Sequence, residues 1–415
     1  MGTEDREKSA ERTVVVIGAS IPGMVCASRL ARSSEFGGRV VLLTGPPPVA
    51  KRLINGCSLR WGTVQCMADA LGTDPEELWE ALGGAPASFS QMWVGWSRPR
   101  DSGYAWIRQM RGGMPDWIGL STRHGHILSC LRARLPEGVE VVEASVPLDA
   151  ALEGPVLRLA EGDVLTLPRD HLLVNATPHF GLLRGKVGPP APRRFVLAVQ
   201  QAQRAVGDLP FGRDVGLVPT YVGETCRQLG FHTPFADPDT PEADWYGINT
   251  AVVKAADLDR DAMMADLEHG LKEMTRALGM EPVAHDDTVG RAIIPVVDHT
   301  GVQTQEHLGF DLPLVDLHRT VSPGAPAVNT DGMLAGTVGA DAFARALVAS
   351  STDLRSSIRP ALVASDRALR PIRFWNRTNI RTYLENPGWL AGLLAWLSQP
   401  AMPYLVKLWT RLGVD

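Results

Sequence analysis

The chain has 415 residues, 45% of them hydrophobic and 21% charged, which is ordinary for a globular protein with a large core. This length is enough for two lobes around one site. The net charge of −5, without a long run of one sign, gives no reason to expect a nucleic-acid partner. The five cysteines lack the paired spacing of a zinc site, so reduced thiols in a cytoplasmic protein are expected.

Neither end of the sequence has the pattern of a targeting or membrane segment. Residues 1–8 are charged and lack the apolar core of a signal peptide. Residues 389–397 are apolar but are bounded by prolines, so no membrane span is expected, and a helical cap on the core is favoured over a surface-bound helix. His124 and His126 have no further ligand pattern around them, and no metal site is expected.

The first informative pattern is Val-Val-Val-Ile-Gly-Ala-Ser-Ile-Pro-Gly over residues 14–23, followed by a second apolar run at 40–44. A strand, a glycine turn, a helix and a second strand are the opening of a dinucleotide-binding unit. Gly18 permits the tight turn, Gly23 lets the helix approach the strand, and the helix N-terminus offers N–H groups to a pyrophosphate. Ser20 stands at the middle glycine, so an ordinary βαβ unit without a nucleotide stays open as the alternative.

The next elements alternate between helical and extended patterns. Asp259 to Leu278 has the spacing of an amphipathic helix, with Met263, Leu267 and Leu271 on one face. Six tryptophans fall between residues 61 and 117, and core packing is favoured for each of them over an aromatic cavity. We expect helices at 70–82 and 123–135, strands at 139–142 and 172–175, and a β-rich stretch at 195–250.

A second pattern, Leu-Val-Asp-Leu-His-Arg-Thr-Val-Ser-Pro, covers residues 314–323. Asp316 follows apolar residues, and Pro323 opens a stretch rich in glycine and alanine that leads into an expected helix at 333–347. Flavoproteins with this kind of N-terminal unit return near their C-terminal end to present an Asp to the ribityl chain of FAD. The position of Asp316 therefore favours a two-part FAD site.

A third segment, Lys-Arg-Leu-Ile-Asn at 51–55, resembles the Arg-Leu-Leu-Asn of FAD-dependent styrene and indole monooxygenases. In the same order, residues 314–323 resemble that family's Gly-Asp-Ile-Gln-Ala-Thr-Val-Asp-Pro. The resemblance continues at Ile-Pro-Val-Val (294–297), Arg-Phe-Trp-Asn-Arg-Thr-Asn (373–379) and Trp-Leu-Ala-Gly-Leu-Leu (389–394). The matching segments therefore follow the order and spacing of the family over nearly the whole chain.

The resemblance implies a flavin-dependent monooxygenase that uses O2 and reduced FAD, supplied by a separate NAD(P)H-dependent flavin reductase. The substrate would be an alkene, an indole or another electron-rich aromatic. Asn55 matches the family's flavin-adjacent Asn and would act on substrate or reacting oxygen. Arg52 would contact the phosphate or the ring carbonyl edge of FAD. A homodimer is compatible with this assignment.

The implied fold is α/β, with a Rossmann-type FAD-binding lobe, an interleaved β-sheet substrate lobe and C-terminal helices, as in flavin hydroxylases. The FAD-binding lobe would take residues 10–80, 123–185 and 291–350. The substrate lobe would take residues 81–122 and the β-rich 186–290, and residues 351–415 would form a helical cap.

At several positions, this chain has a different residue where the family pattern has glycine or another residue that favours anion binding. They are Ser20, Val315, Ser322, the Ala-Pro-Ala-Val run after Gly324, and the Ala-Thr-Pro at 176–178. Weakened FAD binding is therefore expected, since each lost N–H contact to a charged phosphate is worth roughly 1.5–3 kcal/mol. One alternative is a flavin-fold protein with a degenerate FAD site, acting as a non-redox enzyme or a binding partner. The other is a single-component FAD oxidoreductase with a lipid-like substrate.

Overall fold

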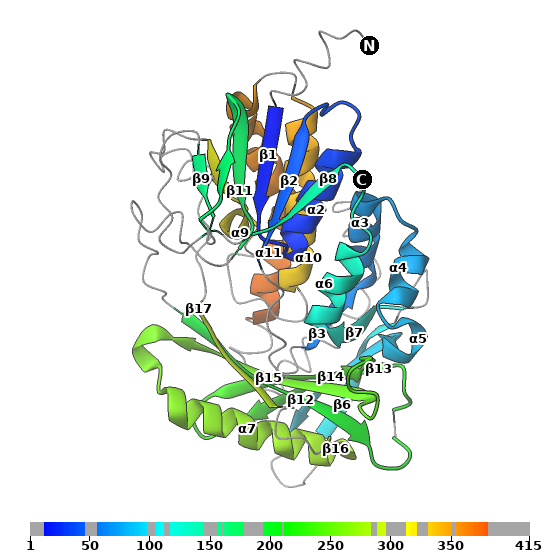
Figure 1. Ribbon diagram of the computed structural model, residues 1–415. Helices are drawn as coiled ribbons and strands as arrows, with labels where there is room; N and C mark the ends of the chain where they lie inside the picture. Colours follow the sequence, from blue (N-terminus) through cyan, green and yellow to red (C-terminus); the bar gives the residue numbers. More distant parts are fainter. Residues whose placement is uncertain are drawn as a thin grey trace.

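A computed structural model shows two lobes, a parallel sheet covered by helices and a larger sheet backed by one long helix (Figure 1). The residues that it describes are 12–45, 56–97, 104–111, 117–144, 146, 156–159, 162–177, 194–209, 211–283, 289–295, 313–321, 331–350 and 353–380.

The first lobe is built on a five-stranded sheet in which every pair of neighbours is parallel. Because both faces of such a sheet are covered, its strands read as continuous apolar runs. Val14, Val15 and Val16 are accordingly all fully buried. The strand order is β18 (Leu314–Asp316), β11 (Asp170–Asn175), β1 (Arg12–Ile17), β2 (Arg39–Thr44) and β8 (Val139–Glu143).

Helices cover one face of this sheet and a small hairpin covers the other. The hairpin, β9 (Val156–Arg158) and β10 (Val164–Thr166), packs Leu157 against Val15 and Leu173. No helix in the described part of the chain is long and apolar enough to cross a membrane. The covering helices are α2 (Ile21–Arg32), α3 (Trp61–Leu71), α6 (His124–Arg132), α10 (Asp331–Val348) and α11 (Leu354–Ile380), with short α9 (Leu317–Thr320) beneath them.

The second lobe is an eight-stranded, mostly antiparallel sheet with α7 (Arg260–Ala277) on one face (Figure 1). Asp259 caps α7 by accepting from the Ala262 N–H at 3.2 Å, and the expected apolar face is buried against the sheet. A short 3-10 turn, Ala255–Asp257, precedes the helix. The strands run β16 (Met280–Pro282), β12 (Arg194–Ala205), β15 (Trp245–Lys254), β14 (Arg227–Pro234), β13 (Val215–Val222), β5 (Gln91–Ser97) and β6 (Tyr104–Arg111), with β17 (Val289–Pro295) on β12.

A small sheet joins the lobes: β3 (Gly56–Arg60), β7 (Gly119–Arg123) and β4 (Ser88–Phe89). Buried hydroxyls link it to β14, since Ser121 Oγ lies 2.5 Å from Ser58 Oγ and 2.7 Å from Thr233 Oγ1. The Tyr246 hydroxyl of β15 donates to the Gly56 carbonyl at 3.0 Å. Buried polar groups need such partners, so these bonds hold the second lobe against the first.

The helix expected over residues 70–82, with Asp74-Pro-Glu-Glu-Leu as a helix start, is divided: α3 ends before Asp74, and α4 begins directly after Asp74 as the start signal indicates. Gly72 takes a left-handed conformation (φ 78°) and ends α3 after Leu71. Asp74 then caps α4 (Pro75–Ala81) by accepting from the N–H groups of Glu76 and Glu77. A turn of α-helix, α5 (Gly84–Ala87), follows. The glycine is thus a stop signal that the helical periodicity alone does not reveal.

The imidazole of His232 gives the second lobe a defined response to acid. It is fully buried on β14 with Nδ1 3.0 Å from Gln203 Oε1, and the Gln203 amide donates to Thr275 Oγ1 at 2.7 Å. Burial penalises the charged ring and lowers the pKa of His232 to about 3. A histidine in an unfolded chain has a pKa of about 6.5. As pH falls between these values, only the unfolded chain gains a proton here, so stability is lost.

We therefore predict that His232→Gln makes the free energy of unfolding less sensitive to acid. Between about pH 7.5 and about pH 4.5, the loss of stability should shrink by about 2.7 kcal/mol relative to wild type. Urea unfolding at the two pH values measures this. His269→Gln, at an exposed position on α7, is the matched control and should keep the wild-type slope. The same slope in His232→Gln would contradict the assignment.

Candidate functional site

The strand order of the parallel sheet reverses at β1. From β1 the chain continues outward through β2 and β8 on one side, and it later returns through β11 and β18 on the other. Ligands of open α/β sheets bind at the carboxyl ends of the strands where the order reverses in this way. The register aligns the strand ends, because Ile17 pairs with Asn175 and Asn175 pairs with Asp316. Gly18 and Asp316 therefore face the same edge, about two strand spacings or 10 Å apart.

The turn after β1 requires glycine at two positions. Gly18 has φ +106°, and a Cβ on it would lie 2.2 Å from Thr177 Cγ2. A Cβ on Gly23 would lie 2.2 Å from the Gly18 carbonyl oxygen. The tight turn and the close approach of helix to strand expected at these glycines are thus both present. Protein atoms already occupy the space that a side chain would need, so both positions are restricted to glycine.

Ser20 caps α2 and fits its position without strain. Its φ of −76° and ψ of 165° are ordinary for any residue. Its Oγ accepts from the Gly23 N–H at 3.3 Å and donates to the Ala176 carbonyl at 2.6 Å. The hydroxyl therefore joins α2 to the end of β11. It also engages one N–H of the first helical turn, and Pro22 in that turn has none, so fewer donors remain for an anion than in a glycine-rich turn.

Asp316 ends β18 with its side chain buried, and Asn175 orients it. The Asn175 Nδ2 donates to Asp316 Oδ1 at 3.4 Å. The Asn175 Oδ1 accepts from Thr177 at both its N–H (3.3 Å) and its hydroxyl (3.0 Å). One amide thus arranges the carboxylate and the residue that touches Gly18. The sequence patterns above did not identify Asn175 as a site residue. The signal that could have identified it is a polar residue at the end of the apolar run Leu-Leu-Val.

The arrangement suits the two halves of a dinucleotide-like cofactor. A helix N-terminus beside a glycine turn favours a phosphate, and a buried carboxylate at a neighbouring strand end can accept hydrogen bonds from sugar-type hydroxyls. Of the site residues expected from the sequence, Gly18, Ser20, Gly23 and Asp316 lie together here. Arg52, Asn55 and Pro323, which complete that set, lie outside the described residues.

Cys57, in the strand that begins just after Asn55, is an inert thiol. Burial raises its pKa to about 12, so it stays protonated at neutral pH. Burial raises the pKa of Cys26 on α2 to about 12 as well. Neither cysteine therefore offers a nucleophile to a molecule at the strand ends.

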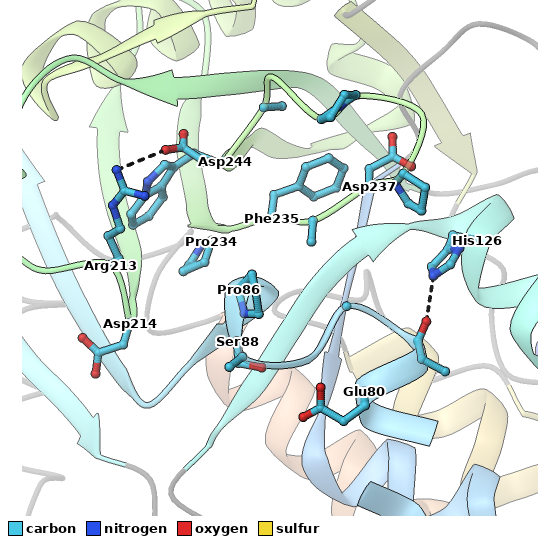
Figure 2. Close-up of a pocket in the computed structure, with 18 residues that line it drawn as sticks. Glu80, Pro86, Ser88, His126, Arg213, Asp214, Pro234, Phe235, Asp237 and Asp244 are labelled. Atoms are coloured by element: carbon cyan, nitrogen blue, oxygen red, sulfur yellow. Dashed lines mark hydrogen bonds and ion pairs between the residues drawn. The ribbon is translucent and has the colours of Figure 1, made fainter. Parts of the chain in front are cut away.

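A pocket of about 760 Å³ lies elsewhere, between the α4–β4 segment and residues 234–245 (Figure 2). None of the residues that line it belongs to β1, α2, β11 or β18. Two of its carboxylates have protein partners: Asp244 lies 3.8 Å from Arg213, and Asp237 lies 2.5 Å from Arg123. The described residues contain no group of three or more His, Cys, Asp or Glu that could hold a metal.

The described tryptophan side chains from the cluster between residues 61 and 117 pack against other apolar groups. Trp61 and Trp79 meet edge to face, with ring centroids 5.0 Å apart. Trp93 lies 6.1 Å from the ring of Phe211 in the second lobe. Trp117 packs against the core of the first lobe. These side chains contribute to packing, and none lines the pocket of Figure 2.

No protein-family model and no curated protein matches the chain. Among solved structures, it is similar to FqzB at 13% identity and a TM-score of 0.59, over 96% of this chain and 94% of that one. It is similar to the halogenase PltM at 13% identity and a TM-score of 0.60, over 97% of this chain and 83% of that one. It is also similar to Xcc4156, a flavin-dependent halogenase from Xanthomonas campestris, at 13% identity and a TM-score of 0.58. This match covers 92% of this chain and 82% of that one.

At such low identity the likeness shows the fold. It confirms the predicted combination of a Rossmann-type parallel lobe with a second, β-rich lobe. The more specific resemblance to styrene and indole monooxygenases is not confirmed by these neighbours.

We predict that removing the Ser20 hydroxyl tightens binding of FAD, the cofactor expected from the sequence. Ser20→Ala frees the Gly23 N–H, and Ser20→Gly also removes the Cβ. A recovered N–H contact to phosphate is worth roughly 1.5–3 kcal/mol, so affinity should rise about tenfold or more in Ser20→Gly. Ser20→Ala should lose roughly 0.5–2 kcal/mol of stability with the helix cap, and Ser20→Gly only a few tenths of a kcal/mol.

Fluorescence titration with oxidised and reduced FAD, alongside thermal melting, measures both effects. Ser20→Thr keeps the hydroxyl and should bind FAD as wild type does. An unchanged or weaker affinity in Ser20→Gly would show that the hydroxyl does not compete with the cofactor.

Proposed function

We propose that the chain is an FAD-dependent monooxygenase of the two-component type. It would take reduced FAD from a separate NAD(P)H-dependent flavin reductase and, with O2, place one oxygen atom on an alkene, an indole or a similar electron-rich aromatic. The observation that carries the proposal is the meeting of the Gly18 turn, the α2 N-terminus and the Asp316 carboxylate at one switch point of the parallel sheet.

In this proposal each group of the site has one task. The turn from Gly18 to Gly23 and the α2 N-terminus would face the pyrophosphate. Asp316 would accept hydrogen bonds from the ribityl hydroxyls, and Pro323 would complete the cofactor-binding set. Arg52 would neutralise phosphate charge or contact the ring edge. When bound, FAD supplies the redox chemistry with O2.

The protein's remaining task is to hold substrate in a dry space. Asn55 would hydrogen-bond substrate or the reacting oxygen. The face of the second sheet opposite α7 carries apolar side chains, among them Val218, Leu229 and Phe231. These side chains are already buried in one cluster with Phe89 and Met92, so they would keep water away from a neighbouring substrate without contacting it.

The need for a separate reductase is supported by the count of nucleotide units. Within the described residues there is one parallel sheet, with one glycine turn of the dinucleotide type at its edge. A nicotinamide cofactor would need a unit of its own. This count supports the proposed supply of hydride by another protein.

Halogenation is the second candidate, because PltM and Xcc4156 are halogenases of the same fold. A flavin-fold protein that no longer binds FAD is the third, favoured by the replaced glycines. One experiment separates them. The purified protein is titrated with reduced FAD and then supplied with a flavin reductase, NAD(P)H, O2 and styrene, indole or a larger indolic substrate, with and without chloride or bromide.

We predict FAD binding and a halide-independent product that carries one oxygen atom from labelled O2. A product with chlorine or bromine in place of hydrogen would favour the second candidate. No FAD binding in either redox state would overturn the flavin assignment. Turnover without any reductase would contradict the two-component type and favour a single-component oxidoreductase.

Substitutions of Asn55 and Arg52 should impair different properties of the enzyme. Asn55→Ala should lower product formed per NAD(P)H consumed by about tenfold while FAD affinity changes less, because a lost side-chain hydrogen bond of ~1–2 kcal/mol would act on the reacting oxygen. Arg52→Ala should do the reverse and weaken FAD binding by about tenfold. Coupled turnover assays and FAD titration of both variants measure this. Equal losses in both variants would contradict the assigned roles.

A further inference from the structure

The arginine at the start of the 373–379 motif has no task in the site described so far. Arg373 lies on α11, and its guanidinium is buried, with 8% of the side chain exposed. Nη1 donates to Asp366 Oδ1 at 2.5 Å, and Nη2 donates to the Thr320 carbonyl at 3.1 Å. One guanidinium thus joins a carboxylate of its own helix to the main chain of another element.

That other element is α9, the turn of helix directly after Asp316. Thr320 also turns its hydroxyl back and donates to the Asp316 carbonyl at 2.9 Å. The contacts therefore run without a gap from Asp366 through Arg373 and Thr320 to Asp316, and from its carboxylate to Asn175.

Packing confines α9 on the sides that hydrogen bonds do not reach. Gly339 of α10 lies so close that a Cβ there would be 2.8 Å from Val321 Cγ1 and 3.1 Å from Leu369 Cδ1 of α11. The Val321 N–H donates to the Leu317 carbonyl at 2.9 Å and closes the turn. With α9 held between α10 and α11, a shift of α11 would be transmitted to Asp316.

The chemistry of this junction requires arginine. The last carbonyls of a helical turn lack partners within the helix, and a cation there is favourable. The planar guanidinium can donate to Thr320 and Asp366 together, whereas the single ammonium of lysine is a point donor on a flexible stem. Asp366 provides the countercharge that lets a cation be buried here.

We propose that Arg373 is a positioning residue that sets the affinity for FAD from outside the cofactor site, by holding α9 and hence the Asp316 carboxylate in place. This rests on the proposed function, in which Asp316 binds the ribityl chain. The C-terminal helix α11 then becomes part of the cofactor-binding machinery without touching the cofactor.

The test compares Arg373→Lys and Arg373→Met with Arg370→Lys. Arg370 is a matched control because it lies on the same helix, is largely exposed and pairs with the other oxygen of Asp366 at 3.5 Å. Titration with FAD should give a dissociation constant about tenfold higher for both Arg373 variants, as expected for one lost charge-assisted hydrogen bond. Arg370→Lys should stay within about twofold of wild type.

Two further measurements separate positioning from general loss of structure. In a double-mutant cycle, Arg373→Lys should weaken FAD binding far less when Asp316 is already Ala, because the arginine acts through that carboxylate. Hydrogen exchange of the apo protein should show faster exchange at the amides of residues 317–321 in Arg373→Met, with the strands of the parallel sheet unchanged.

The outcomes distinguish this proposal from the proposed function. If wild-type protein binds no FAD, both fail together. If wild type binds FAD and the Arg373 variants bind it equally well, this inference alone is overturned. Additive losses in the double-mutant cycle, or unchanged exchange at residues 317–321, would overturn it as well.

Discussion

The structure depends on the parallel pairing of β18 with β11, made by two strands that lie 141 residues apart at Asn175 and Asp316. Register in a parallel pair is set by which side chains must be buried, and a slip of one residue would turn Asp316 away from the edge. Val315, fully buried opposite Val174, prevents that slip. Val315 stands where the pattern of styrene and indole monooxygenases has glycine, and its burial therefore keeps Asp316 at this edge of the sheet.

The order of the strands along the chain also explains how the two lobes are interleaved. The chain leaves the parallel sheet after β2, builds the small sheet with β3 and β7, and returns as β8. A second excursion between β11 and β18 builds most of the large sheet. Each return is a parallel strand, so the ends of all the strands lie along one edge, and the hydroxyl chain through Ser121 fixes the second lobe beside it.

Much of the fold could be predicted from sequence because its signals are local. The run of residues 14–17 and the spacing of Met263 and Leu267 identify their elements without reference to the rest of the chain. The part that could not be predicted depends on distant partners. Ser20 reads as a lost glycine, yet its φ is ordinary and its hydroxyl partner, Ala176, lies 156 residues away. Asn175 likewise acquires its role only when β18 lies beside it.

The cap made by Ser20 has a consequence for how a cofactor would be exchanged. Its hydroxyl satisfies the Gly23 N–H and the Ala176 carbonyl from within the protein. The Gly23 N–H and the Ala176 carbonyl therefore stay hydrogen-bonded when no anion is bound. Departure of a ligand leaves neither group without a hydrogen-bond partner. Such a turn suits a protein that passes through a stable empty form in every cycle. For an enzyme loaded by another protein, FAD would behave as a diffusible co-substrate with a short residence time and not as a permanent prosthetic group.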